Sequence, residues 1–262
     1  MKVIDFHCHV YPDAIAPKAS DSVRQFYGLG NEAMDGTVAS LLRYGKQAGV
    51  DSYLILPVSL RPERTRHINE FILSQLREHD CFYGYGTIHA GMENICEEVE
   101  FIMNNGLKGI KMHPDSQVFD LDDPRLFPAY DMIQGKLPVI LHMGDQRYDY
   151  SHPHRLRTLL EKFPRLQVIA AHFGGYSMYE TAAELLTDRD CFFDVSSSLM
   201  FMEEGVAEKF INHYGAERFV YGSDFPMWNP AEEMERFKKL KLTDRQFDQI
   251  SHETAEYLLQ LK

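Results

Sequence analysis

The sequence predicts one (β/α)8 TIM barrel over residues 1–262, with an additional C-terminal helix, and three observations lead to that prediction. Short apolar runs alternate along the chain with helical patterns, as expected for parallel strands that are buried on both faces. Several of these runs end in a histidine or an aspartate, at the strand ends where such a barrel keeps its chemistry. The length suits one barrel, and no break in composition marks a second domain.

The first strand is expected over residues 3–10 and contains two histidines one residue apart. Residues i and i+2 of a strand point to the same face, so Asp5, His7 and His9 share one side. Two converging imidazoles can bind a divalent metal ion, but catalytic zinc needs at least three protein ligands and an open position. The rest of the ligand set is therefore expected at later strand ends.

The remaining elements follow in chain order. Residues 11–35 contain Pro12, Pro17, Gly28 and Gly30, which predict a long irregular loop that is either a substrate lid or a surface insertion. A capping-box pattern at Thr243 predicts the start of the last helix. Strands are expected over residues 51–58, 81–90, 107–114, 138–142, 166–172, 191–196 and 218–224, and helices over residues 38–49, 64–78, 93–104, from 124 onward, 154–163, around 182–186, and 243–259.

The strand ends bring together residue types that bind metals or transfer protons. Each of them alone is compatible with a structural role, as a core histidine, a turn-capping aspartate or an exposed lysine. Together, imidazoles and a carboxylate in one barrel mouth would be costly to desolvate, whereas a metal ion compensates them all. The candidates are His7, His9, Lys111, His113, His142, His172 and Asp224.

Composition excludes several classes of function. With 39 acidic and 27 basic residues the net charge is -12, which disfavours a nucleic-acid surface or an anionic membrane as partner. The four cysteines include no CxxC pair, so free thiols in a reducing compartment are expected. We find no signal peptide and no bilayer-spanning run, which predicts a cytoplasmic protein that acts on a small molecule, with homo-oligomerisation left open.

The order of the strand-end motifs resembles the amidohydrolase superfamily, specifically the amidohydrolase-related branch that includes aminocarboxymuconate-semialdehyde-decarboxylase-like enzymes. The motifs are Asp5 to His9, Gly109 to Pro114, His142, His172 with its following glycines, and Asp224 with Pro226. The resemblance implies a barrel with a divalent metal, usually zinc, and we expect one ion per chain. The ligands carried over are His7, His9, His142 and Asp224.

The resemblance also bears on the neighbouring residues. His172 matches a histidine that contacts the activated water in one-metal relatives and becomes a ligand in two-metal relatives. Lys111 lies near where two-metal relatives carry a carboxylated lysine, which leaves a second metal as the alternative.

Together, the metal ligands and the neighbouring acid–base residues predict a hydrolase of a small amide, lactone or ester-like substrate. A divalent metal lowers the pKa of its water to about 7, and Asp224 can accept a proton and return it to a leaving group. His172 can orient the water or stabilise an oxyanion, and Lys111 or His113 can polarise a carbonyl or bind a carboxylate. The alternatives are a metal-dependent decarboxylase of an unsaturated or aromatic carboxylate, and a barrel that binds metal without turnover.

Three residues beyond the strand ends are candidates for binding the substrate: Arg147, Tyr148 and Trp228. Arg147 could bind a substrate carboxylate, but an ion pair with Asp145 or Asp149 is an equally good interpretation. The aromatic residues could stack on a substrate ring or simply close the barrel mouth.

Overall fold

The computed structural model describes residues 2–29 and 34–261 of the chain. Its backbone contacts divide it into two compact units, which we describe separately. Unit 1 comprises Met1–Leu56 and Val195–Lys262, and unit 2 comprises Pro57–Asp194. A single domain over residues 1–262 stays a prediction.

Unit 1 is built around the first strand, β1 (Ile4–Cys8), which is buried along its whole length. It pairs in parallel with β2 (Ser52–Ile55). On its other side lies the segment that follows β9 (Phe219–Val220): the amide of Phe6 donates to the carbonyl of Tyr221 at 2.8 Å, and Cys8 forms a parallel bridge with Phe225. The residues of β1 are thus fixed from both sides by backbone hydrogen bonds.

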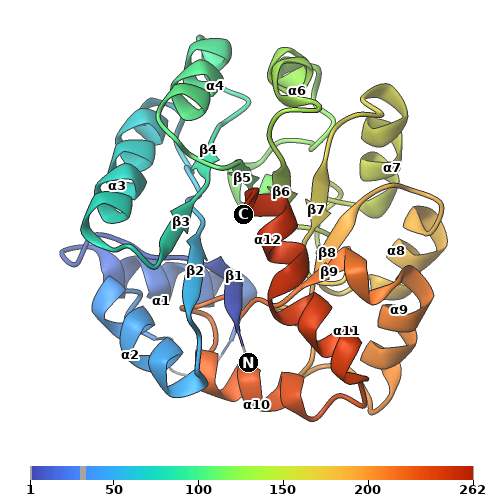
Figure 1. The fold of residues 1–262 in the computed structure, drawn as a ribbon. Helices are drawn as coiled ribbons and strands as arrows, with labels where there is room; N and C mark the ends of the chain where they lie inside the picture. The colour runs from blue at the N-terminus through green and yellow to red at the C-terminus, as the bar shows by residue number, and fades with distance from the viewer. Residues whose placement is uncertain (1, 30–33, 262) are drawn as a thin grey trace. The chain divides into compact units, whose positions relative to one another are not determined.

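Helices flank these strands in Figure 1, where α2 and α10 pack against each other. The predicted capping box is confirmed: the side chain of Thr243 accepts from the amide of Gln246, and the Gln246 side chain accepts in return. The predicted last helix is present but contains one π-helical turn. The helices of unit 1 are α1 (Ala16–Tyr27), α2 (Val38–Ala48), α9 (Val206–Tyr214), η3 (Ala216–Arg218), α10 (Pro230–Lys238), α11 (Asp244–Asp248), η4 (Gln249–Glu253) and α12 (Thr254–Leu259).

The prediction of an irregular loop over residues 11–35 is wrong for its middle part, which forms helix α1. Pro17 lies in the first turn, where its missing N–H leaves no hydrogen bond unmade, and Gly28 caps the end with a φ of 65°. These residues therefore mark the two ends of a helix. Residues 30–33 lie outside the described residues, so the lid remains a prediction.

Unit 2 contains five consecutive parallel strands, β4 to β8, each paired in register with the next. The predicted third strand, residues 81–90, is split at Tyr85 into two short strands. Side chains on both faces are buried; Val139, Ile140 and Leu141 expose no surface. The strands are β3 (Phe82–Gly84), β4 (Gly86–Thr87), β5 (Ile110–Met112), β6 (Val139–Leu141), β7 (Val168–Ala170) and β8 (Phe192–Asp194).

The main helices of unit 2 lie along one side of its strands (Figure 1). Four follow the predicted ranges, whereas the segment from residue 124 onward is a short 3-10 turn that leads into a helix. The elements are η1 (Pro62–Arg64), α3 (Thr65–Glu78), α4 (Ile95–Asn104), α5 (Pro114–Gln117), η2 (Pro124–Leu126), α6 (Phe127–Ile133), α7 (Pro153–Lys162) and α8 (Tyr179–Leu186).

Candidate active site

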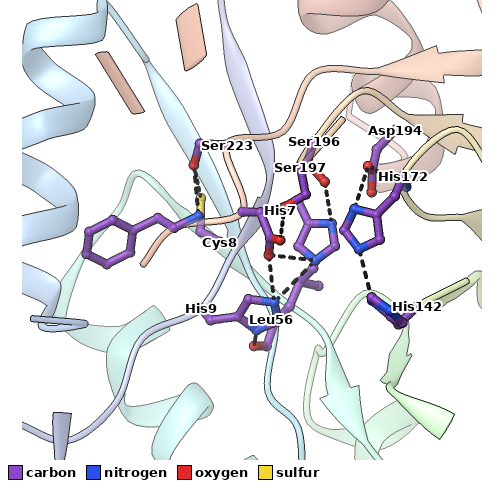
Figure 2. A network of polar contacts seen from close by, with 12 residues as sticks. His7, Cys8, His9, Leu56, His142, His172, Asp194, Ser196, Ser197 and Ser223 are labelled. Carbon is purple, nitrogen blue, oxygen red and sulfur yellow. Dashed lines mark hydrogen bonds and ion pairs between the residues drawn. The ribbon is translucent and has the colours of Figure 1, made fainter. Parts of the chain in front are cut away.

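His7 in β1 and His9, one residue beyond the end of β1, converge as the strand periodicity predicts, and their Nε2 atoms lie 3.2 Å apart. The Nδ1 atom of His9 is 2.7 Å from the carbonyl oxygen of Leu56 (Figure 2). Because a carbonyl only accepts, this Nδ1 must carry the proton, and in the neutral ring Nε2 is left with its lone pair. His7 is buried, and its Nδ1 lies 3.3 Å from the hydroxyl of Ser196.

Asp224 completes a group of three ligand-type atoms in unit 1. Its Oδ1 lies 3.5 Å from Nε2 of His7 and 3.4 Å from Nε2 of His9. Atoms bound at about 2.0–2.2 Å to a tetrahedral ion lie roughly 3.3–3.6 Å from one another, close to these separations. One proton can bridge one pair of these atoms but not all three, so the donor set suits a divalent cation.

The backbone holds the Asp224 carboxylate in this position. Asp224 has a φ of 56°, a left-handed conformation that aspartate tolerates better than most residues, and its amide donates to the carbonyl of His7 at 2.8 Å. A Cβ at Gly222 would lie 2.7 Å from Cβ of His7, so only glycine allows the two segments to approach this closely. Gly222 is therefore part of the site's scaffold, a role that sequence reasoning missed.

Asp5 supports the same segment through hydrogen bonds from backbone amides. Its Oδ1 accepts from the amides of Ser223 at 2.8 Å and His7 at 3.3 Å, and its Oδ2 has no hydrogen-bond partner among the described residues. Burial raises the pKa of Asp5 to about 6 although these hydrogen bonds oppose the shift. Its place on the histidine face of the first strand was the only sequence signal for this residue.

The second oxygen of Asp224 is held by Ser197, a residue that the sequence did not single out. The hydroxyl of Ser197 donates to Oδ2 of Asp224, and the indole N–H of Trp228 donates to the Ser197 oxygen at 2.8 Å. Trp228 was predicted either to contact the substrate or to close the barrel mouth; its indole N–H binds Ser197, and substrate contact stays a prediction. The run of serines after the seventh strand was the available signal for Ser197.

Unit 2 contains a second group of two histidines and an aspartate, His113, Asp115 and His142. The imidazoles of His113 and His142 are stacked, with centroids 3.8 Å apart and planes 9° apart. Lone pairs of nearly parallel rings run side by side and do not converge, so these two rings cannot both point at one ion. This arrangement makes the group a poor metal site.

His142 and His172 lie together, as the prediction that they share a site requires. Nδ1 of His142 is 3.0 Å from Nε2 of His172 (Figure 2), and both side chains are buried. His172 has a φ of 60°, and its amide donates to Oδ1 of Asp194 at 3.0 Å. Asp194, which fixes this strained turn, was another residue that sequence reasoning missed.

Asp115 lies beside this pair. Its Oδ2 accepts from the Ser151 hydroxyl at 2.5 Å, and burial raises its pKa to about 6. Lys111 on β5 is 1% exposed, so it is not an exposed strand end.

The candidate substrate residues of unit 2 have partners of their own. Arg147 forms paired hydrogen bonds with the buried carboxylate of Asp145, from Nε to Oδ1 at 2.9 Å and from Nη2 to Oδ2 at 2.6 Å. This ion pair is one of the alternatives predicted for Arg147 from the sequence. Tyr148 is partly exposed, with the Arg147 guanidinium 5.3 Å from its ring centre. Substrate binding by either residue stays a prediction.

A third group, Asp149, His152 and His154, lies on the surface of unit 2. Nδ1 of His152 already accepts from the amide of His154 at 3.1 Å, and Arg155 binds the Asp149 carboxylate at 2.5 Å. The Nδ1 lone pair of His152 and the Asp149 carboxylate are thus engaged by neighbouring groups.

Among the residues that the structure describes, no helix is long and apolar enough to cross a bilayer.

Comparison with known proteins identifies the fold. The amidohydrolase family model Amidohydro_2 matches residues 4–261. An uncharacterized TIM-barrel protein from Bordetella bronchiseptica superposes with a TM-score of 0.84 at 20% identity, covering 99% of each chain. The predicted parallel barrel is thereby confirmed. No curated protein matches the sequence.

Two further solved structures share the fold and carry names that suggest activities. A dihydroxybenzoic acid decarboxylase from a Polaromonas species, with bound manganese and the inhibitor 2-nitroresorcinol, has a TM-score of 0.76 at 16% identity and covers 99% of this chain and 97% of its own. A protein from Pseudomonas putida, named as a suggested 2-pyrone-4,6-dicarboxylic acid hydrolase, has a TM-score of 0.68 at 19% identity with the same coverage. At these identities they establish the fold alone.

Proposed function

The chain belongs to the amidohydrolase family, and on that premise we propose that it is a divalent-metal-dependent enzyme that hydrolyses a small amide, lactone or ester-like substrate. The observation that carries the proposal is the convergence of Nε2 of His7, Nε2 of His9 and Oδ1 of Asp224 at separations of 3.2–3.5 Å. The resemblance adds His142, in unit 2, as the remaining ligand. His142→Ala tests that assignment through metal content.

The donor set is nitrogen and oxygen without a thiolate, which suits zinc or manganese. A divalent ion held there supplies a water whose pKa is lowered to about 7. We propose one ion per chain, zinc as the first candidate, and manganese, which is bound in the Polaromonas relative, as the second.

Asp224 is the proposed proton-transfer residue. Its carboxylate, which the Ser197 hydroxyl holds at Oδ2 and whose Oδ1 faces the imidazoles, would accept the proton of the attacking water and return it to the leaving group. His172, whose ring is held beside His142, orients the water or stabilises the developing oxyanion. Lys111 and His113 are proposed to polarise the substrate carbonyl or to bind its carboxylate.

The second candidate function is non-oxidative decarboxylation of a small unsaturated or aromatic carboxylate. It is supported by the structural relatives, which include 5-carboxyvanillate and 2,6-dihydroxybenzoate decarboxylases as well as the manganese-containing enzyme. In this reaction the same acid–base residue would deliver a proton to carbon while carbon dioxide leaves.

A substrate screen with the metal-loaded protein separates the two reactions. Lactones, amides and aromatic or unsaturated carboxylates are supplied at neutral pH, and both carbon dioxide and ring-opened or deacylated acids are measured. Hydrolysis products without carbon dioxide support the first proposal. Carbon dioxide release supports the second, and a metal-loaded protein that turns over neither class would support the third alternative, metal binding without catalysis.

A further inference from the structure

We propose that Ser197 and Trp228 are positioning residues that fix Asp224 as a one-oxygen metal ligand, and that Trp228 therefore reports whether the site is occupied. The inference rests on the proposed function, because it requires a metal ion at His7, His9 and Asp224. It concerns residues of unit 1 alone.

Hydrogen bonds are donated from Trp228 to Ser197 and from Ser197 to Asp224, and the donor hydrogens of each group fix this order. The Trp228 indole has an N–H and no lone pair to accept with, so it can only donate, and it does so to the Ser197 oxygen at 2.8 Å. The Ser197 hydroxyl has one hydrogen, and the acceptor on its other side is Oδ2 of Asp224. Trp228 therefore orients the Ser197 hydroxyl, and Ser197 orients the carboxylate.

This orientation decides which carboxylate oxygen faces the imidazoles. With Oδ2 held by Ser197, Oδ1 is the oxygen that lies 3.4–3.5 Å from the two histidine Nε2 atoms. A carboxylate without that hydrogen bond can rotate or present both oxygens. Hydrogen bonds to ligating groups typically change metal affinity by about 10- to 100-fold when they are lost.

The backbone also holds Ser197 in place at a conformational cost. Ser197 is buried and has a φ of 50°, so both it and Asp224, with a φ of 56°, occupy the left-handed region. Non-glycine residues keep such conformations only where the surroundings impose them, and they concentrate at functional sites. The strained backbone at Ser197 therefore supports a functional role for the position of its hydroxyl.

Trp228 is the one tryptophan of the chain and is half-buried. Its edge-to-face neighbour is Phe201, with ring centres 5.9 Å apart. Since two hydrogen bonds link its N–H to Oδ2 of the Asp224 carboxylate, a cation bound at Oδ1 of the same carboxylate alters the environment of the indole. Fluorescence excited where tyrosine absorbs little therefore reports on this site.

Zinc titration of the metal-free full-length protein tests the proposal, with affinity from calorimetry and Trp228 emission as a second readout. Ser197→Ala and Ser197→Gly both remove the hydroxyl, but only glycine suits the positive φ, so the two variants should differ in stability and agree in zinc affinity. We expect both to bind zinc about 10- to 100-fold more weakly. Trp228→Phe keeps a ring and loses the N–H, and we expect a smaller loss of a few fold.

The matched control is Ser198→Ala, the next serine, whose hydroxyl donates instead to the carbonyl of Ser196 at 2.9 Å. Its zinc affinity should equal that of the wild type. The emission change on zinc addition should persist in Ser198→Ala and shrink in Ser197→Gly.

The outcomes separate this inference from the proposed function. If the wild type binds zinc and Ser197→Gly, shown to be folded by circular dichroism, binds it equally well, the positioning role is wrong and the metal site stands. If the wild type binds neither zinc nor manganese, both proposals are overturned.

Discussion

Two groups of residues, one in each unit, have the same composition and opposite geometry. His7, His9 and Asp224 in unit 1, and His113, Asp115 and His142 in unit 2, each hold two imidazoles and a carboxylate with ligand-type atoms within 4.8 Å. The rings of the first pair are inclined by 63° and their Nε2 atoms converge, whereas those of the second are stacked at 9°. Residue type and proximity thus do not define a metal site; the directions of the lone pairs do.

The difference follows from where the histidines lie in the sheet. His7 lies in β1 and His9 one residue beyond its end, and a hydrogen bond to the carbonyl of Leu56 orients the His9 ring. His113 and His142 follow Met112 and Leu141, which are register partners on neighbouring strands. Neighbouring strands lie about 4.8 Å apart, so side chains at matched positions stand side by side and flat rings stack.

The largest expected difference between the two groups is in metal content. His9→Ala removes one of three converging donors, so the purified protein should fall from about one equivalent of divalent metal to nearly none. His113→Ala should keep its metal, because its ring is parallel to that of His142. Elemental analysis of both variants, grown with added zinc, measures this directly, and metal loss from His113→Ala alone would reverse our assignment.

The next largest effect is on turnover, and the two aspartates provide a matched pair. Asp224→Asn keeps the size and a possible oxygen ligand but removes the basic carboxylate, so kcat should fall on the order of 100-fold or more, with a smaller loss of metal. Asp115→Asn, the equivalent change in unit 2, should leave kcat within a few fold. Both are measured on metal-replete enzyme with the substrate found in the screen.

Wild-type turnover by metal-replete Asp224→Asn would exclude Asp224 as the proton-transfer residue. His172 would then be the leading candidate for that role.

The contrast between the two groups also shows what sequence could predict. Strand periodicity alone places His7 and His9 on one face, and the apolar runs locate the strand ends that carry His142, His172 and Asp224. The barrel and most helices follow from the same patterns. These features depend on residues close together in the chain, which is why they can be read from sequence.

Features that depend on remote partners could not be read in this way. The His9 tautomer depends on Leu56, and the Asp224 orientation depends on Ser197 and Trp228, all brought together by the fold. The stacking of His113 on His142 depends on strand register. Helix α1 was missed because proline and glycine look alike as loop residues and as helix ends.

The smallest expected effect concerns a buried carboxylate of unit 1 outside both groups. Glu233 on α10 is 1% exposed, and burial raises its pKa from 4.5 to about 7, although Arg236 opposes the shift. Because the folded pKa lies above the unfolded one, the contribution of Glu233 to stability is fully present below about pH 4.5 and is lost as the pH rises through about 7. Wild-type protein should therefore unfold more easily at pH 8 than at pH 5.

Between pH 5 and pH 8 the free energy of unfolding should fall less in Glu233→Gln than in the wild type, by on the order of 2 kcal/mol. One pKa unit is worth about 1.4 kcal/mol, and the variant also gives up its pairing with Arg236. Glu232→Gln is the control: its side chain is 64% exposed and also pairs with Arg236. Urea unfolding of the three proteins at pH 5 and pH 8, with a chelator present, isolates the buried carboxylate from metal binding. The control should lose as much stability between the two pH values as the wild type. An equal loss in Glu233→Gln would mean that Glu233 is ionised in the folded protein at both pH values, with Arg236 compensating its burial.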